Sequence, residues 1–214
     1  MMKNLWLIRH CESMANAGHV TADAAGIELT ELGQRQAKLL PFSFDKSPEL
    51  IVTSPFLRTK QSSVHVRDKF PEVPHEEWPV QEFSYLSAKR YANTSTVQRR
   101  PAVKEYWQKC DPKYCDGDGA ESFSHLLDRV DEMFEKVRGR PEKFIAIFTH
   151  GQFMKTVWWL SQTSNIYFRN EAAQMKHAEG FMNRIDISNG AILKLKMIGN
   201  KWDVQLERLK DNNL

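Results

Sequence analysis

The chain has 214 residues, of which 41% are hydrophobic and 27% charged, and its formal net charge is +3. This composition is ordinary for a globular domain and excludes disordered and fibrous proteins. A net charge this small does not indicate a nucleic-acid-binding protein. Because no stretch approaches the roughly 20 apolar residues of a membrane span, we expect neither nucleic acid nor a membrane as a partner.

Cysteine usage indicates a reducing compartment. The chain has three cysteines, an odd number, and the apolar residues 5–8 are too few for a signal peptide. We therefore expect a cytoplasmic protein with reduced thiols. Cys110 and Cys115 have no histidine between them, which favours two free thiols over a zinc site.

Three short apolar runs end on residues suited to binding a phosphate group. Residues 5–8 lead into Arg9 and His10, residues 50–52 precede a segment that contains Arg58, and residues 144–148 precede His150. Unbroken apolar runs of this length are typical of strands buried on both faces of a parallel sheet. Ligands of open α/β sheets bind at the carboxyl ends of the strands. The sequence therefore predicts an α/β fold that gathers these side chains at one edge, with the two arginines on neighbouring strands.

The segments between the apolar runs carry start and stop signals for helices. Thr30 is a candidate N-cap, Ser54 precedes a proline suited to the first helical position, and Ser122 precedes an apolar stripe of helical period. Alternating apolar residues near the end of the chain predict a terminal hairpin on the sheet edge, around a turn at residues 199–200. Helices are expected over residues 31–40, 55–70, 123–137 and 151–161, and the hairpin over residues 192–206.

Residues 71–119 are the least regular part of the chain. Between residues 86 and 109, six basic residues stand against a single acid, Glu105. A long insertion with its own charge bias is typical of a functional lid, although a solvated surface explains such a cluster equally well. We expect residues 1–214 to form a single domain with a basic lid-like insertion at about residues 83–119, which we call the lid. Its basic residues are Lys89, Arg90, Arg99, Arg100, Lys104 and Lys109.

These residue types suit chemistry on a phosphoryl group, which is dianionic near neutral pH. The guanidinium groups of Arg9 and Arg58 fit its oxygens in bidentate pairs. A neutral imidazole can attack phosphorus and form a covalent intermediate, and His10, beside Arg9, is the better candidate for this role. His150 is then suited to donate hydrogen bonds to the equatorial oxygens. The alternative, two core histidines, is disfavoured by their charged and glycine neighbours.

The leaving alcohol requires a proton. A carboxylic acid can supply it if a bound phosphate dianion raises the pKa of that acid by repulsion. Glu82, which follows a short strand predicted to end at residues 80–81, is the candidate acid. Glu76 and Glu77 lie close enough in the sequence to take the role instead. Glu12 is too near His10 to oppose it across a substrate, and we expect it to be a structural partner.

Four motifs resemble those of the histidine phosphatase superfamily, the phosphoglycerate-mutase-like proteins. Residues 7–16 read Leu-Ile-Arg-His-Cys-Glu-Ser-Met-Ala-Asn and resemble the Arg-His-Gly signature. Residues 54–61 are similar to the second arginine motif, residues 119–122 to the glycine-glutamate-serine helix start, and residues 149–151 to the second histidine motif. Together they occur in the family's order over residues 5 to about 160. The resemblance implies a three-layer α/β/α sandwich whose mostly parallel central sheet has an antiparallel edge.

Carried over by position, the resemblance implies that His10 is the phosphorylated nucleophile and Glu82 the proton donor, with no metal or organic cofactor. A metal site that includes His10 is disfavoured, because adjacent residues chelate poorly and the arginines repel a cation. Asn16 is equally compatible with a loop-capping role. The phosphate pocket is expected to comprise Arg9, Asn16, Arg58 and His150, with further substrate contacts from Gly151 and from the lid residues Arg90 and Arg99.

One departure from the family pattern is Cys11, which stands where the family usually has glycine. A thiol of this size can be tolerated there. A sharper hypothesis is that the electropositive surroundings lower the pKa of the thiol, so that its oxidation inhibits the protein.

The resemblance favours a phosphatase that acts on a small phosphorylated metabolite. The tyrosine motif typical of the mutase branch is not found in residues 83–87, although a phosphoglycerate-type mutase stays an alternative. A catalytically weak member that binds a phospho-ligand or phosphoprotein is the second alternative. The basic lid suggests a substrate with more than one anionic group. The sequence does not predict the oligomeric state.

Overall fold

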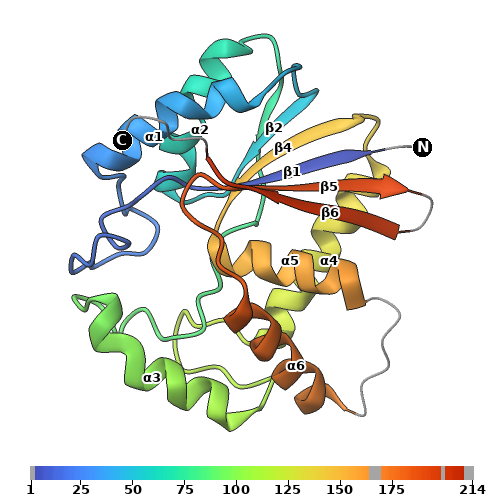
Figure 1. Cartoon of the computed structure of the whole chain (residues 1–214). Coiled ribbons are helices and arrows are strands. Elements are labelled where there is room, and N and C mark those ends of the chain that lie inside the picture. Colours follow the sequence, from blue (N-terminus) through green and yellow to red (C-terminus); the bar gives the residue numbers. More distant parts are fainter. Residues whose placement is uncertain (1–2, 164–169, 199–200, 210–214) are drawn as a thin grey trace.

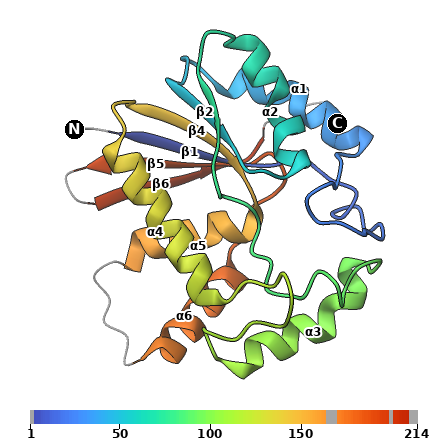
Figure 2. The same cartoon turned by 180° about the vertical axis from the view of Figure 1, so that it is seen from behind.

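The computed structural model describes residues 3–163, 170–198 and 201–209 (Figures 1 and 2). Its sheet has six strands in the order β3-β2-β4-β1-β5-β6. The first four in this order run parallel to one another, and β5 and β6 are antiparallel at one edge, as predicted. The strands are β1 (Asn4–Arg9), β2 (Leu50–Thr53), β3 (His75–Glu77), β4 (Phe144–Thr149), β5 (Ile192–Ile198) and β6 (Lys201–Glu207). Because β4 lies between β1 and β2, the expectation that Arg9 and Arg58 follow neighbouring strands is wrong.

Helices cover both faces of this sheet, which makes the three layers that were predicted. Two separate apolar cores form because successive strand residues point to opposite faces, so that Leu7 belongs to one core and Ile8 to the other. Figures 1 and 2 show α1 (Glu31–Leu39) and α2 (Leu57–Lys69) on one side, and α4 (Phe123–Gly139) and α5 (Gly151–Thr163) on the other. No helix in the described part of the chain combines the length and apolar character that a membrane crossing requires.

Two of the three predicted helix caps are present. The side chain of Thr30 accepts a hydrogen bond from the Gly33 N–H at 3.0 Å, and that of Ser122 accepts one from the His125 N–H at 3.2 Å. The third prediction is wrong, because α2 begins two residues later than Pro55 and its N-cap is Phe56, without a side-chain cap. Ser54 serves a different purpose, since its hydroxyl lies 2.7 Å from Nε2 of His150.

Two helices were not predicted from the sequence. Within the lid, α3 (Thr96–Lys109) includes Pro101, a residue that disfavours helix interiors. A complete capping box between Ser95 and Gln98 stabilises its start. The other helix, α6 (Glu171–Arg184), begins at the N-cap Asn170 and lies beside α5 (Figure 1).

The segment before Glu82 also differs from the expectation. The strand predicted to end at residues 80–81 ends at Glu77 instead, and residues 78–82 have no regular structure. They are anchored to the sheet by the hydroxyl of Thr149, which donates to the carbonyl oxygen of Val80 at 2.5 Å. This contact brings Glu82 to the carboxyl end of β4. The predicted hairpin turn at residues 199–200 lies outside the described residues.

Aromatic side chains join the lid to the rest of the molecule. The rings of Phe83 and Trp107 lie 6.3 and 5.9 Å from that of Phe123 on α4. Tyr106 and Trp107 are buried in the same core as α4 and α5. The lid therefore has a packed base, which fixes α3 relative to the sheet.

Gly33 is required by the close approach of α1 to the segment that follows β1. A Cβ atom at this position would lie 2.0 Å from the carbonyl oxygen of Glu12. We predict that Gly33→Ala lowers the free energy of unfolding by about 1–3 kcal/mol, a typical cost of overpacking. Thermal unfolding followed by circular dichroism should show Tm falling by roughly 2–4 °C for each kcal/mol.

The matched control is Gly139→Ala at the end of α4, where an added Cβ would meet nothing within 4 Å. This variant should unfold at the wild-type temperature or slightly above it. Equal Tm values for Gly33→Ala and wild type would contradict the steric argument.

Candidate active site

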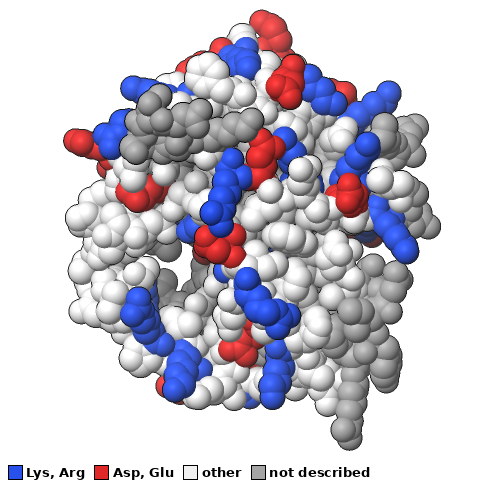
Figure 3. Space-filling view, in the orientation of Figure 1, with Lys and Arg blue, Asp and Glu red and all other residues white. Residues whose placement is uncertain are grey.

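The side chains predicted to bind and attack a phosphoryl group lie together at the carboxyl ends of the strands. His10 follows β1, His150 follows β4, and Arg58 is in the first turn of α2. The ring centroids of His10 and His150 are 5.1 Å apart. The space-filling view shows the surface hollowed on this side, between the segment after β1 and the lid (Figure 3).

The imidazole of His10 has a defined tautomer. Its Nδ1 lies 2.7 Å from the carbonyl oxygen of Cys11, which can only accept, so Nδ1 carries the proton. Its Nε2 accepts a hydrogen bond from Nε of Arg58 at 3.2 Å. Burial first, then the charges of Arg58 and Arg9, hold the pKa of His10 well below its usual value. The ring is therefore neutral near pH 7 and has its lone pair on Nε2.

His150 is also buried and neutral, but it has the opposite tautomer to His10. Nη2 of Arg58 donates to Nδ1 at 3.0 Å, so the proton is on Nε2, which donates to the hydroxyl of Ser54 at 2.7 Å. Burial, followed by the charges of Arg58 and His10, lowers the pKa of this imidazole well below its usual value. His150 can therefore donate to a phosphate oxygen through Nδ1 only after it takes up a second proton.

Two guanidinium groups face the histidines, that of Arg58 buried and that of Arg9 half-buried. In the described part of the chain, their hydrogen bonds go to imidazole nitrogens and to the carbonyl oxygens of Ala24 and Ile187, rather than to carboxylates. Nε of Arg9 is buried without a hydrogen-bond partner among the described residues. Burial lowers the pKa of Arg58 to about 10 and also lowers the pKa of Arg9. Cations buried in this way favour the binding of an anion.

Gly151 permits the close approach of Arg9 to the start of α5. A Cβ atom on Gly151 would lie 3.3 Å from Nε of Arg9, tighter than an ordinary contact. The glycine therefore keeps room for the guanidinium, and its predicted contact with substrate stays a prediction.

Glu82 lies at the N-terminus of α5, on the same side as the two arginines. Its Oε1 accepts hydrogen bonds from the backbone N–H groups of Phe83, Gln152 and Phe153 at 3.1, 3.0 and 3.3 Å. The hydrogen bonds found in the described residues all fall on Oε1, which leaves Oε2 for proton exchange.

The two acids that could have replaced Glu82 are occupied elsewhere. Glu76 is bonded to Arg140 at 2.7 Å, and Glu77 is paired with Lys60 at 2.7 Å. Glu12 accepts from the hydroxyl of Thr30 at 2.7 Å, so its predicted structural role is confirmed. Of the acids weighed from the sequence, Glu82 alone remains suited to proton transfer.

Asn16 holds its loop together through its carbonyl oxygen. Oδ1 accepts from the backbone N–H and the hydroxyl of Ser13, at 3.2 and 3.0 Å, and from Nδ2 of Asn189 at 3.0 Å. The loop role that the sequence left open is thus present, and the Asn16 amide nitrogen is left for a ligand. Asn189 was not predicted as a site residue. The one feature of the sequence that marks this position is the Asn-Gly pair before β5, which is typical of a turn.

The two lid arginines have different surroundings. Arg90 is 58% exposed and its guanidinium pairs with the buried Asp116 at 2.9 Å, so it is engaged within the lid. Arg99, on α3, is half-buried and lies near Tyr85. Burial and then Glu82 raise the pKa of Tyr85 to about 12, whereas Arg99 acts in the opposite direction.

The hypothesis of a reactive thiol at Cys11 is wrong. This side chain is fully buried in the core that includes Ile8, Leu29 and Ala37. Burial raises the pKa of the thiol to about 12, so the thiol is not ionised at neutral pH. Its backbone N–H donates to the hydroxyl of Ser62 at 2.9 Å. The apolar core accommodates a cysteine where the family usually has glycine.

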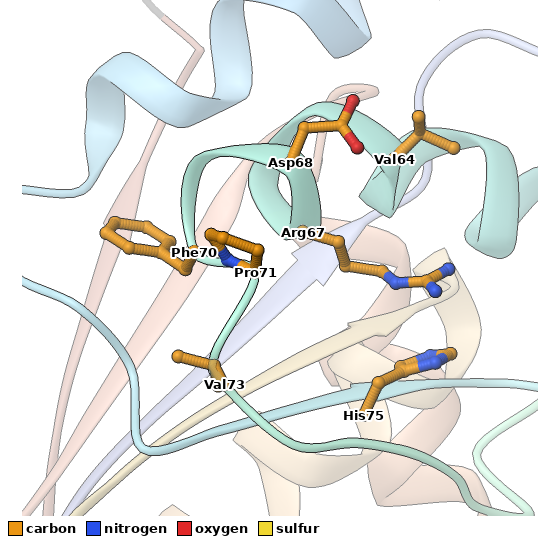
Figure 4. A pocket seen from close by; sticks show the side chains of 7 residues that line it. All are labelled: Val64, Arg67, Asp68, Phe70, Pro71, Val73 and His75. Carbon is orange, nitrogen blue, oxygen red and sulfur yellow. The ribbon is translucent and has the colours of Figure 1, made fainter.

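A separate pocket of about 530 Å³ lies between the end of α2 and the start of β3 (Figure 4). It is at the opposite end of the parallel strands from the histidines and includes none of the predicted site residues. Its lining residues are Val64, Arg67, Asp68, Phe70, Pro71, Val73 and His75.

Solved structures similar to this chain have the same fold. The α-ribazole phosphatase from Shigella flexneri is 19% identical, with a TM-score of 0.71 and coverage of 95% of each chain. A mutant phosphoserine phosphatase from Entamoeba histolytica, in complex with phosphoserine, is 16% identical, with a TM-score of 0.70 and coverage of 94% of each chain. A mycobacterial glucosyl-3-phosphoglycerate phosphatase in complex with VO3 is 16% identical, with a TM-score of 0.70, and the match covers 96% of this chain and 98% of that one.

Comparison with protein families covers nearly the whole chain. No curated protein sequence matches closely enough to count as a relative. The model of the histidine phosphatase superfamily (branch 1), however, matches residues 5–209. This range contains both histidines and both arginines of the site, together with Glu82. The chain therefore belongs to the histidine phosphatase superfamily.

Proposed function

We propose that this protein is a metal-independent phosphomonoester hydrolase that acts on a small phosphorylated metabolite through a phosphohistidine at His10. The observation that carries the proposal is the neutral imidazole of His10, with its lone pair on Nε2, beside the guanidinium groups of Arg9 and Arg58, which make no hydrogen bond to a carboxylate among the described residues. The two fixed cations oppose the binding of a metal ion. The three similar structures are those of phosphatases, which supports the proposal.

The first half of the reaction transfers the phosphoryl group to the protein. Nε2 of His10 attacks phosphorus as the bond to the leaving oxygen breaks, and Oε2 of Glu82 gives its proton to that oxygen. The imidazole becomes cationic, and the carbonyl of Cys11 stabilises it through Nδ1–H. Arg9 and Arg58 neutralise the phosphoryl oxygens, where transition-state charge collects.

The second half returns the protein to its starting state. Glu82, now a carboxylate, takes a proton from water while the water oxygen attacks phosphorus and the bond to Nε2 breaks. Binding of the dianion also favours uptake of a proton from solvent by His150 at Nδ1, which turns this acceptor into a donor toward a phosphoryl oxygen, and the proton returns to solvent when phosphate leaves. Each proton and each bond is thus restored within one cycle.

The covalent intermediate at His10 can be tested with labelled para-nitrophenyl phosphate. An acid-labile, alkali-stable phosphoryl label should be trapped on His10 during turnover, and His10→Ala should lose about 10³-fold or more in kcat. His19→Ala, at an exposed position, is the control. Full turnover by His10→Ala would refute the proposal. Interconversion of phosphoglycerates would indicate the mutase, and binding without turnover would indicate a phospho-ligand-binding protein.

The pH dependence of kcat/KM follows from the lowered pKa of both histidines. Because their pKa values lie well below the usual range, lowering the pH toward 6 does not protonate them. The acid limb should instead reflect the second pKa of the phosphate ester, which is around 6. Profiles for an alkyl and an aryl ester should therefore shift with the pKa of each ester. A limb that stays near pH 6.5 for both esters would contradict this.

Arg99 is proposed to bind a second anionic group on the substrate. Arg99→Ala should lower kcat/KM for 3-phosphoglycerate about 10- to 100-fold, since hydrogen bonds to charged groups contribute about 1.5–3 kcal/mol. Hydrolysis of para-nitrophenyl phosphate, which lacks such a group, should change less than about threefold. Arg100→Ala is the matched control, because the neighbouring Arg100 is exposed. Equal losses on both substrates, or no loss, would exclude this role. Arg90, which is paired with Asp116, is expected to contribute less.

A further inference from the structure

The segment between α6 and β5 is tied to the active site by several hydrogen bonds. Nη1 of Arg9 donates to the carbonyl of Ile187 at 2.5 Å. The N–H of Gly190 donates to the carbonyl of Arg9 at 3.1 Å. Residues 187–190 therefore form one wall of the site, although they carry none of the motifs described above.

A tight turn holds Asn189 in this wall. The N–H of Ala191 donates to the carbonyl of Ser188 at 3.1 Å, which closes a four-residue β-turn. Gly190, the third residue, has a φ of +73°, which a type II turn requires and which glycine adopts without strain. Asn189 is the second residue, and its side chain reaches the carboxyl end of β1.

Both hydrogens of the Asn189 amide have partners in the site. Nδ2 donates to the carbonyl oxygen of His10 at 2.9 Å and to Oδ1 of Asn16 at 3.0 Å. One amide group thus joins the backbone of the nucleophile to the loop that carries Asn16. A primary amide is required, because a hydroxyl or a carboxylate cannot donate two hydrogen bonds at this reach.

The first hydrogen bond fixes the peptide group beside the nucleophile. The carbonyl of the His10–Cys11 peptide accepts from Asn189, and its N–H donates to the hydroxyl of Ser62 at 2.9 Å. The imidazole of His10 in turn donates to the carbonyl of Cys11, which belongs to the next peptide. The held His10–Cys11 peptide joins the Cα atom that carries the imidazole to the residue whose carbonyl orients it, so the direction of the Nε2 lone pair depends on that peptide.

The second hydrogen bond fixes the orientation of Asn16. Its Oδ1 already accepts from Ser13, so the amide nitrogen must point away from Ser13 and Asn189. That nitrogen is the part of Asn16 that can donate to an anion.

We infer that Asn189 is a positioning residue that orients the His10 imidazole and the Asn16 amide for a phosphoryl group. This inference rests on the proposed function for the identity of the ligand. Asn189 itself touches neither the ligand nor the reacting atoms. It acts through two groups that do, so its removal should affect phosphate binding through Asn16 and turnover through His10.

The test compares Asn189→Ala, Asn16→Ala and the double variant. Binding of inorganic phosphate, measured by calorimetry, should weaken about tenfold in each single variant, and kcat for para-nitrophenyl phosphate should fall about 10- to 100-fold in Asn189→Ala. Because Asn189 acts through Asn16 in binding, the double variant should bind phosphate no more weakly than the worse single variant. Asn183→Ala, at an exposed position on α6, is the matched control and should behave as wild type.

Several outcomes would overturn the inference. The inference would be wrong if Asn189→Ala bound phosphate as wild type does and had the wild-type kcat. It would also be wrong if the losses of phosphate affinity in the two single variants added up in the double variant. If Asn189→Ala does not fold, the side-chain amide protons of Asn189 in ¹⁵N-labelled wild type decide instead, because the inference requires slow exchange with solvent. Fast exchange of both protons would overturn it. Absence of turnover in wild type would refute the proposed function, whereas the binding cycle would still test the coupling of Asn189 to Asn16.

Discussion

The structure depends on one electrostatic constraint, which is that the buried guanidinium of Arg58 and the half-buried guanidinium of Arg9 lie beside two imidazoles. Removing an ion from water costs several kcal/mol unless an opposite charge is bonded to it. Here the hydrogen bonds of Arg9 and Arg58 are made to carbonyl oxygens and ring nitrogens, and Glu82 acts on both charges without a hydrogen bond to either among the described residues. Both histidines must therefore remain neutral, and their tautomers follow from the hydrogen bonds around them.

Several strands of the fold bring these guanidinium and imidazole groups together. The parallel strands β1, β2 and β4 deliver His10, Arg58 and His150 to one edge of the sheet, and β4 separates the other two strands. The site is assembled from distant parts of the chain, and Arg58 of α2 is bonded to the imidazoles that follow both β1 and β4. The irregular stretch before Glu82 completes the site by docking on Thr149.

Sequence patterns predicted those features that are visible over a few residues. Apolar runs identified the strands, Thr30 and Ser122 identified two helix starts, and the placement of His10 and His150 after strands identified the site. The helix α3 was not predicted because Pro101 disfavours a helix interior. The capping box that favours this helix contributes little free energy, and the aromatic packing that also favours it is visible only in the folded chain.

Other features depend on contacts that no local pattern contains. Ser54 was expected to cap α2, but the neighbouring His150 competes for its hydroxyl. Asn189 lies 179 residues after His10, so only the folded chain brings the amide to that carbonyl. The surroundings of Cys11 were judged from charged neighbours in the sequence, whereas its side chain points into an apolar core.

The contact between Arg58 and Nε2 of His10 has a consequence for selectivity. While the guanidinium N–H occupies the lone pair, the ring is shielded from alkylating and acylating reagents that carry no charge. In the proposed reaction, an anionic substrate competes for the same N–H and so releases the lone pair once its negatively charged group is in place. The imidazole that we propose as the nucleophile is then occupied in the resting protein and is freed by the compound that is to react with it.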